Sequence, residues 1–167
     1  MGRVVELLAK AFAFAGGAVL VAMLGMSVAS ITGRAVFGRP IQGDFELVQF
    51  GCAIGIAAFL PWCQFRRGNI IVDFFTSGLP PRAQAFLDGV GALLLALVMA
   101  LVAWRAALGA EAVWASGERA MISRVPQWIA YAAIVPPLAF TAVVGLYTAG
   151  ESLQQALKGS EQLTRKE

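Results

Sequence analysis

Long apolar runs separated by short polar stretches dominate the chain, and charged residues within these runs lie only near their ends. An α-helix needs roughly 20 apolar residues to cross the hydrocarbon core of a bilayer. We therefore predict four transmembrane helices, over residues 11–33, 45–65, 86–104 and 128–150. The pattern leaves open whether the third helix continues toward Ala115. The predicted fold class is an all-α integral membrane protein.

The predicted helices form one transmembrane domain that covers residues 1–167 and ends in a polar tail, residues 151–167. Hydrophobic residues make up 59% of the chain and charged residues 14%, whereas a soluble domain carries about 25% charged residues. The mean hydropathy of +0.73 also indicates that lipid surrounds the chain. Because the basic residues are spread over the loops and form no continuous stripe, nucleic acid is excluded as a partner.

The connection between the second and third spans contains an apolar stretch at residues 69–79 that is too short to cross a bilayer. Such a segment typically lies along the membrane interface. We expect an amphipathic interfacial helix here, with Asp73 able to cap it and Arg82 following its end. The competing interpretation is a solvated loop with incidental apolar residues.

Four spans place both termini on the same side of the membrane. Cytoplasmic loops carry an excess of Lys and Arg, which indicates the side. The terminal side has eight such residues: Arg3, Lys10, Arg66, Arg67, Arg82, Lys158, Arg165 and Lys166. The opposite side has five: Arg34, Arg39, Arg105, Arg119 and Arg124. We therefore expect both termini in the cytoplasm.

Small residues spaced four apart mark places where membrane helices approach closely. Each span has such a pair or series: Gly25 and Ala29; Gly51 and Gly55; Ala92, Ala96 and Ala100; Gly145 and Ala149. A compact bundle follows, but the sequence does not show which pairs join helices of this chain and which face another subunit. Gly51 and Gly55 are candidates for a partner interface.

Two consecutive prolines, Pro136 and Pro137, lie near the middle of the fourth span. Proline has no backbone N–H, so the carbonyls of Ala132 and Ala133 each lose a helical hydrogen bond. We expect a kink at this point. The sequence does not separate a static bend from a moving hinge.

The residues that usually carry chemistry are scarce. The chain has no histidine, which removes the commonest general base and most zinc sites. Cys52 and Cys63 are eleven residues apart on one predicted helix, about 16 Å along its axis, beyond the roughly 7 Å that a disulfide allows between Cα atoms. We predict no catalytic, cofactor-binding or metal-binding residues and no enzymatic activity.

Ionisable groups near the centre of a bilayer usually mark ion or proton pathways. Here Glu46, Asp88 and Arg105 all lie near the ends of spans. This favours a membrane subunit that supports transport carried out by another chain. The alternative is a stand-alone, proton-coupled carrier of small solutes that acts as a homodimer, with Glu46 as its coupling carboxylate.

A set of short motifs follows in order along nearly the whole chain. These are RAVFGRP at residues 34–40, Glu46, FRRGNIIVD at 65–73, LPPR at 79–82 with Asp88 downstream, and VPQW at 125–128 with Pro136 downstream. Together they resemble the small permease (DctQ-type) subunit of tripartite ATP-independent periplasmic (TRAP) transporters. The resemblance implies residence in a bacterial inner membrane and sodium-coupled uptake (symport) of organic acids.

The same resemblance implies two protein partners, a periplasmic substrate-binding protein and a large permease subunit, besides the surrounding membrane lipids. Sodium is expected to bind the large permease, and this chain would act as a scaffold without a cofactor. Arg34, Arg39 and Glu46 would form a charged cluster at the outer face that contacts a partner, with Glu46 pairing to Arg34 or Arg39. Asp73 and Arg82 would fix the interfacial segment at the inner face.

Overall fold

Four long α-helices make up most of the molecule. A computed structural model describes residues 2–39, 41–68 and 80–164. The helices are α1 (Gly2–Phe37), α2 (Asp44–Phe65), α4 (Pro81–Ser116) and α5 (Trp128–Thr164). Each is long and apolar enough to cross a membrane, so the predicted all-α membrane fold is confirmed.

The helices extend beyond the predicted spans at several ends. α1 begins nine residues before position 11, and α4 continues past position 104 to Ser116, in the direction that the sequence had left open. α5 carries the polar segment after residue 150 as further helix up to Thr164. The predicted interfacial segment, residues 69–79, lies outside the described residues, and so does Asp73.

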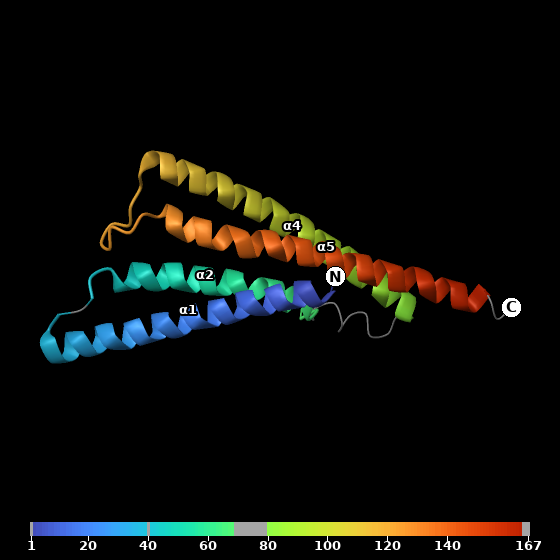
Figure 1. Cartoon of the computed structure of the whole chain (residues 1–167), viewed down its shortest axis with the longest axis horizontal. Helices are drawn as coiled ribbons and strands as arrows, with labels where there is room; N and C mark the ends of the chain where they lie inside the picture. Colours follow the sequence, from blue (N-terminus) through green and yellow to red (C-terminus); the bar gives the residue numbers. More distant parts are fainter. Residues whose placement is uncertain (1, 40, 69–79, 165–167) are drawn as a thin grey trace.

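Two antiparallel hairpins form the fold, α1 with α2 and α4 with α5 (Figure 1). α2 also packs against α5, which gives the packing order α1, α2, α5, α4. A further contact joins α1 to α5, because the Phe12 and Phe140 rings lie 5.5 Å apart between centroids. The two hairpin turns lie at the same end of the molecule, the left end of Figure 1.

The sequence around the turns explains where the helices begin and end. Gly43 precedes α2 with φ +76°, and Gly117 ends α4 with φ +66°, a left-handed conformation that glycine adopts without steric cost. Proline at the first position of α4 is also favourable, because its missing N–H would have no helical partner there. Asp44 and Glu46 lie in the first turn of α2, where negative charge interacts favourably with the helix dipole.

Glycine and alanine let the two backbones of each hairpin approach closely. A Cβ atom built on Gly16 of α1 would lie 2.8 Å from Ala58 Cβ and 2.9 Å from the Gly55 carbonyl oxygen of α2. A Cβ on Gly145 of α5 would lie 2.9 Å from Ala96 Cβ of α4. Backbones this close exclude larger residues, as is typical of helix contacts in membranes.

Gly25 and Ala29 do not serve as a seam of α1 within the described residues. Both are exposed, and a Cβ on Gly25 would have no atom within 4 Å. The pair therefore joins none of the described helices of this chain, and a contact with another subunit stays a prediction. The close approach of α1 occurs at Gly16, on the face of the helix that meets α2.

Three helices meet at a small apolar core formed by Ala57 of α2, Ala103 of α4 and Leu138 of α5. A polar contact lies on the same α2–α5 boundary, where Gln64 Nε2 donates a hydrogen bond of 3.0 Å to Thr148 Oγ1. Both side chains are buried, and a buried amide is stable only when it has such partners. This contact contributes to holding the two hairpins together.

α5 is continuous through Pro136 and Pro137. One turn later, Thr141 Oγ1 donates a 2.7 Å hydrogen bond back to the Pro137 carbonyl, a pattern that often bends helices. The kink remains a prediction.

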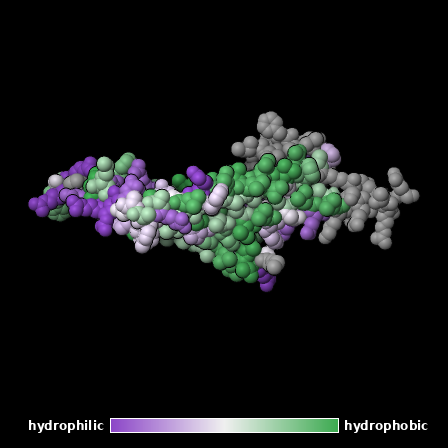
Figure 2. Space-filling model, turned by 90° about the horizontal axis from the view of Figure 1, so that it is seen from above, coloured by the Kyte–Doolittle hydropathy of each residue, from purple (hydrophilic) through white to green (hydrophobic). Residues whose placement is uncertain are grey.

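The molecular surface divides by polarity. Figure 2 shows a broad hydrophobic region over the middle of one face and hydrophilic residues gathered at the end that carries the hairpin turns. Large apolar side chains are exposed along the helices, with Phe14 of α1 and Leu97 of α4 at 80% and 61%. This distribution is that of a protein whose sides lie in lipid or against another membrane protein.

Candidate functional site

Glu46 connects the two hairpin turns. Its side chain points from the first turn of α2 to the loop before α5, and its Oε2 accepts 2.8 Å hydrogen bonds from the backbone N and the Oγ of Ser123. Oε1 accepts a further hydrogen bond of 3.1 Å from the Ile122 N–H. A carboxylate that accepts several N–H and O–H donors is a strong anchor, so Glu46 holds the loop of the second hairpin against the first.

The close approach of the two turns also requires glycine at position 43. A Cβ on Gly43 would lie 2.8 Å from the Ser123 nitrogen, so only glycine leaves room for the loop. Gly43 therefore serves both the left-handed turn before α2 and the contact with Ser123.

Asp44 closes the turn of the first hairpin. Its Oδ2 accepts a hydrogen bond from Ser30 Oγ of α1, and the same hydroxyl accepts a 3.3 Å hydrogen bond from the Ile41 N–H. The Arg34 guanidinium lies 3.9 Å from Asp44 Oδ2. Ser30 is buried, whereas Arg34 is largely exposed, so Asp44 joins a buried hydroxyl to a surface cation.

The expected pairing of Glu46 with Arg34 or Arg39 was therefore wrong in its partners. Arg34 pairs with Asp44, and the Glu46 carboxylate binds the Ile122–Ser123 backbone instead. Reasoning from the sequence missed Ser123 because it lies 77 positions beyond Glu46. It missed the role of Asp44 because the partners of that carboxylate, Ser30 and Arg34, lie on the preceding helix. Arg39 is exposed, and its backbone N–H donates a hydrogen bond to the Gly33 carbonyl.

Exposed apolar side chains surround this anchor. Phe37 and Phe45 flank the first turn, and Met121 and Ile122 lie on the second loop; Met121 is 95% exposed. We call these four residues the apolar tip. They form an exposed hydrophobic surface beside a loop that several hydrogen bonds hold in place. Exposed apolar surfaces of this kind often mark sites where other proteins or the membrane bind.

A second exposed apolar surface runs along α4, which packs mainly against α5. Between positions 86 and 108 its exposed large side chains are Phe86, Leu87, Leu93, Leu94, Leu97, Val98, Leu101, Val102, Trp104 and Leu108. We call this set the α4 face. The helix buries its Ala92 and Ala96 side against Gly145, which leaves the bulky residues outward.

The other predicted interface residues occupy different positions. Gly51 and Gly55 are buried under Met23 and Leu20 of α1, so their seam joins two helices of this chain. The Arg82 side chain, like Asp73, lies outside the described part of the structure.

The side chains suited to metal or redox chemistry are scattered. Among residues 2–39, 41–68 and 80–164, no three His, Cys, Asp or Glu side chains come together as a possible metal site. Cys52 and Cys63 are free thiols.

We predict that Glu46→Ala loosens the loop between α4 and α5. The substitution removes the acceptor of the Ile122 and Ser123 amides, so their hydrogen exchange should accelerate about tenfold. Hydrogen exchange with mass spectrometry of the purified chain measures this. The control is Glu111→Ala, an exposed carboxylate in α4. Unchanged exchange at residues 122 and 123 would show that Glu46 does not hold the loop.

Four helices long and apolar enough to cross a membrane define the class of this chain, a multi-pass α-helical membrane protein. Residues 23–155 match the family described as tripartite ATP-independent periplasmic transporters, DctQ component. The chain belongs to this family and is a transporter component, not an enzyme. No curated protein and no solved structure matches the chain.

Proposed function

We propose that the chain is a non-catalytic scaffold that binds and braces the large permease subunit of a sodium-coupled TRAP transporter for organic acids. A periplasmic substrate-binding protein completes the assembly. The chain lies in the bacterial inner membrane with both termini in the cytoplasm. Family membership supports the role as the small subunit, and the scaffold role has support of its own.

One observation carries the proposal: the middle of every helix is uncharged. Residues 11–33, 47–65, 89–104 and 128–150 contain no Asp, Glu, Lys or Arg. The buried polar side chains among the described residues are serine, threonine and glutamine. Ionisable groups within a membrane usually mark the pathway of an ion or a charged substrate, so we assign this pathway to another subunit.

The exposed surfaces suit a scaffold. The α4 face offers a row of large apolar side chains that α5 leaves uncovered, and we assign it to the large permease. The apolar tip, at the end opposite the termini, would contact a partner outside the membrane. Its base is fixed by Glu46, whose hydrogen bonds to Ser123 would hold the tip in one orientation.

The position of Glu46 also disfavours the homodimeric carrier. A coupling carboxylate must exchange protons during transport and face the transported solute. The Glu46 carboxylate instead accepts hydrogen bonds from the Ile122 and Ser123 amides of the neighbouring loop. These hydrogen bonds favour a structural role for Glu46.

Affinity purification of the tagged chain from its native membrane tests the proposal. In a mild detergent we expect a large multi-span membrane protein to co-purify in roughly equal amounts. Leu94→Ala, Leu97→Ala and Leu101→Ala combined on the α4 face should lower its recovery. The control combines Leu24→Ala, Val28→Ala and Ile31→Ala, at exposed positions of α1, and should leave recovery unchanged.

Reconstitution separates the two functions. The chain alone in proteoliposomes should give no flux of organic acids under a sodium gradient. Solute flux by the chain alone that is lost in Glu46→Gln would contradict the scaffold and support the carrier.

A further inference from the structure

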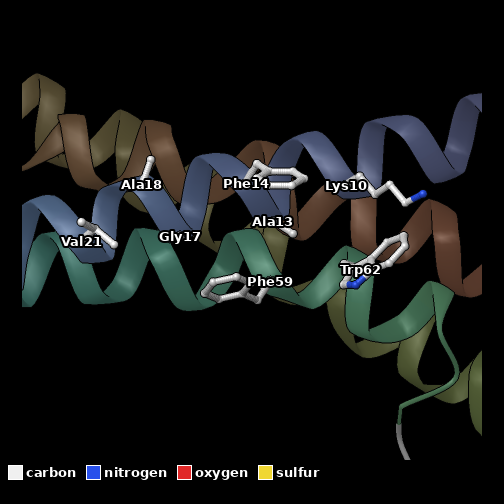
Figure 3. Close-up of a pocket in the computed structure, with 8 residues that line it drawn as sticks. All are labelled: Lys10, Ala13, Phe14, Gly17, Ala18, Val21, Phe59 and Trp62. Carbon is white, nitrogen blue, oxygen red and sulfur yellow. The ribbon is translucent and has the colours of Figure 1, made fainter.

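An open groove runs along the outside of α1 and α2. It has a volume of about 710 Å³, and Ala13, Phe14, Gly17 and Val21 of α1 line it together with Phe59 and Trp62 of α2 (Figure 3). Gly17 leaves the floor low, since a Cβ there would meet only Phe59 Cζ, at 3.9 Å. The walls are apolar, and one end carries Lys10.

The length of the groove corresponds to one leaflet. From Lys10 to Val21 the helix advances eleven residues, about 16 Å, and half of the roughly 30 Å hydrocarbon core is about 15 Å. Lys10 lies at the end nearer the N-terminus, just before the uncharged residues 11–33. The groove therefore begins at the level of the headgroups and ends near the middle of the membrane.

Cations gather at the headgroup end. The Lys10 ammonium lies 5.4 Å from the centre of the Trp62 ring and the Arg66 guanidinium 5.5 Å from it. Glu6 pairs with Lys10 at 2.7 Å, and Arg3 and Arg66 also attract this carboxylate. Three cations around one carboxylate leave a net charge of +2, and an exposed pair such as Glu6–Lys10 contributes little stability, so Lys10 remains available to an anion.

From this combination we infer a binding site for an anionic phospholipid of the leaflet on the side of the termini. One acyl chain lies in the groove along Phe14, Gly17 and Phe59, and the phosphate lies between Lys10 and Arg66. The Trp62 indole lies at the boundary, where tryptophan prefers the interface. A transmembrane helix would need a groove along the whole span, whereas this one has the length of one leaflet and a charged entrance, which favours a lipid.

Native mass spectrometry of the full chain released from detergent tests the site, with dioleoyl phosphatidylglycerol and dioleoyl phosphatidylcholine as probes. We expect the anionic lipid to bind roughly tenfold more tightly, because each nearby cation attracts an anionic headgroup. Lys10→Gln with Arg66→Gln should abolish this preference. The control, Arg105→Gln with Arg119→Gln, changes two exposed cations outside the groove and should keep it.

A second variant tests the acyl chain. Gly17→Leu fills the groove from its floor and should weaken both lipids, whereas Gly25→Leu, at an open position of the same helix, should weaken neither. Equal binding of the two probes by the unmodified chain would overturn the proposal. So would unchanged binding in Gly17→Leu. Ala18 also lines the groove, and a photo-crosslinker at this position that captures a protein instead of a lipid in the native membrane would likewise overturn it.

Discussion

Gly16→Val is expected to destabilise the chain by about 2 to 3 kcal/mol, near the top of the range for overpacking. The added Cβ would lie 2.9 Å from the Gly55 carbonyl oxygen, an atom of the backbone that cannot rotate away. The Ala58 Cβ, at 2.8 Å, blocks the other direction. α1 and α2 must therefore separate, and the contacts of the first hairpin weaken along their length. Thermal unfolding in detergent measures the loss.

Gly25→Val is the matched control, because it makes the same change in the same helix. No atom lies within 4 Å of a Cβ at this position, so the stability should change by less than about 0.5 kcal/mol. An equal loss in the two variants would mean that valine acts through the conformation of α1 and that the seam with α2 is not the cause.

The second large effect is expected for Gly145→Val, at about 1 to 3 kcal/mol. Its Cβ would lie 2.9 Å from Ala96 Cβ and 3.3 Å from the Ala92 carbonyl oxygen. Since α4 packs mainly against α5, pushing these helices apart removes the principal support of α4. A lower unfolding temperature should therefore accompany reduced recovery of the proposed large permease partner with the tagged chain.

Gly150→Val serves as the comparison, five residues further along α5, where the position is open. It should preserve both the unfolding temperature and the recovery of the partner. If Gly145→Val unfolds at the same temperature as the unmodified chain, the close contact between α4 and α5 does not contribute to stability as proposed.

The number and type of helices could be predicted because the signal is local. Each span is a long run of apolar residues, and the absence of charge along it is visible without any knowledge of neighbours. The ends were less predictable. α1 reaches back to Gly2, where charged residues alternate with apolar ones, and the Glu6–Lys10 pair one turn apart suits a helix as well as a polar flank.

Which small residue forms a seam depends on the partner helix. Gly16 and Gly25 are nine residues apart, about 900° of rotation, so they lie on opposite faces of α1. Both look alike in the sequence, and only the position of α2 selects Gly16. For the same reason the Gly51–Gly55 pair was visible as a motif, while its partner was not.

The sequence predicted one carboxylate of the polar site but not its partners. Glu46 stood out as a carboxylate at the start of a span, and its neighbour Asp44 has the same local setting. Which residue each carboxylate contacts depends on how the two turns meet. Ser123 lies against Glu46, and Arg34 pairs with Asp44. Nothing in the local sequence around either carboxylate encodes that choice.

The contact of Ser123 with Gly43 and Glu46 has a mechanical consequence. α4 and α5 have 36 and 37 residues, about 54 Å at 1.5 Å per residue, and Glu46 links this second hairpin to the first at the end that carries the turns. A force applied to Met121 passes directly to the start of α2 without first travelling through α4 and α5. We therefore expect the two hairpins to tilt together when a load acts on the second.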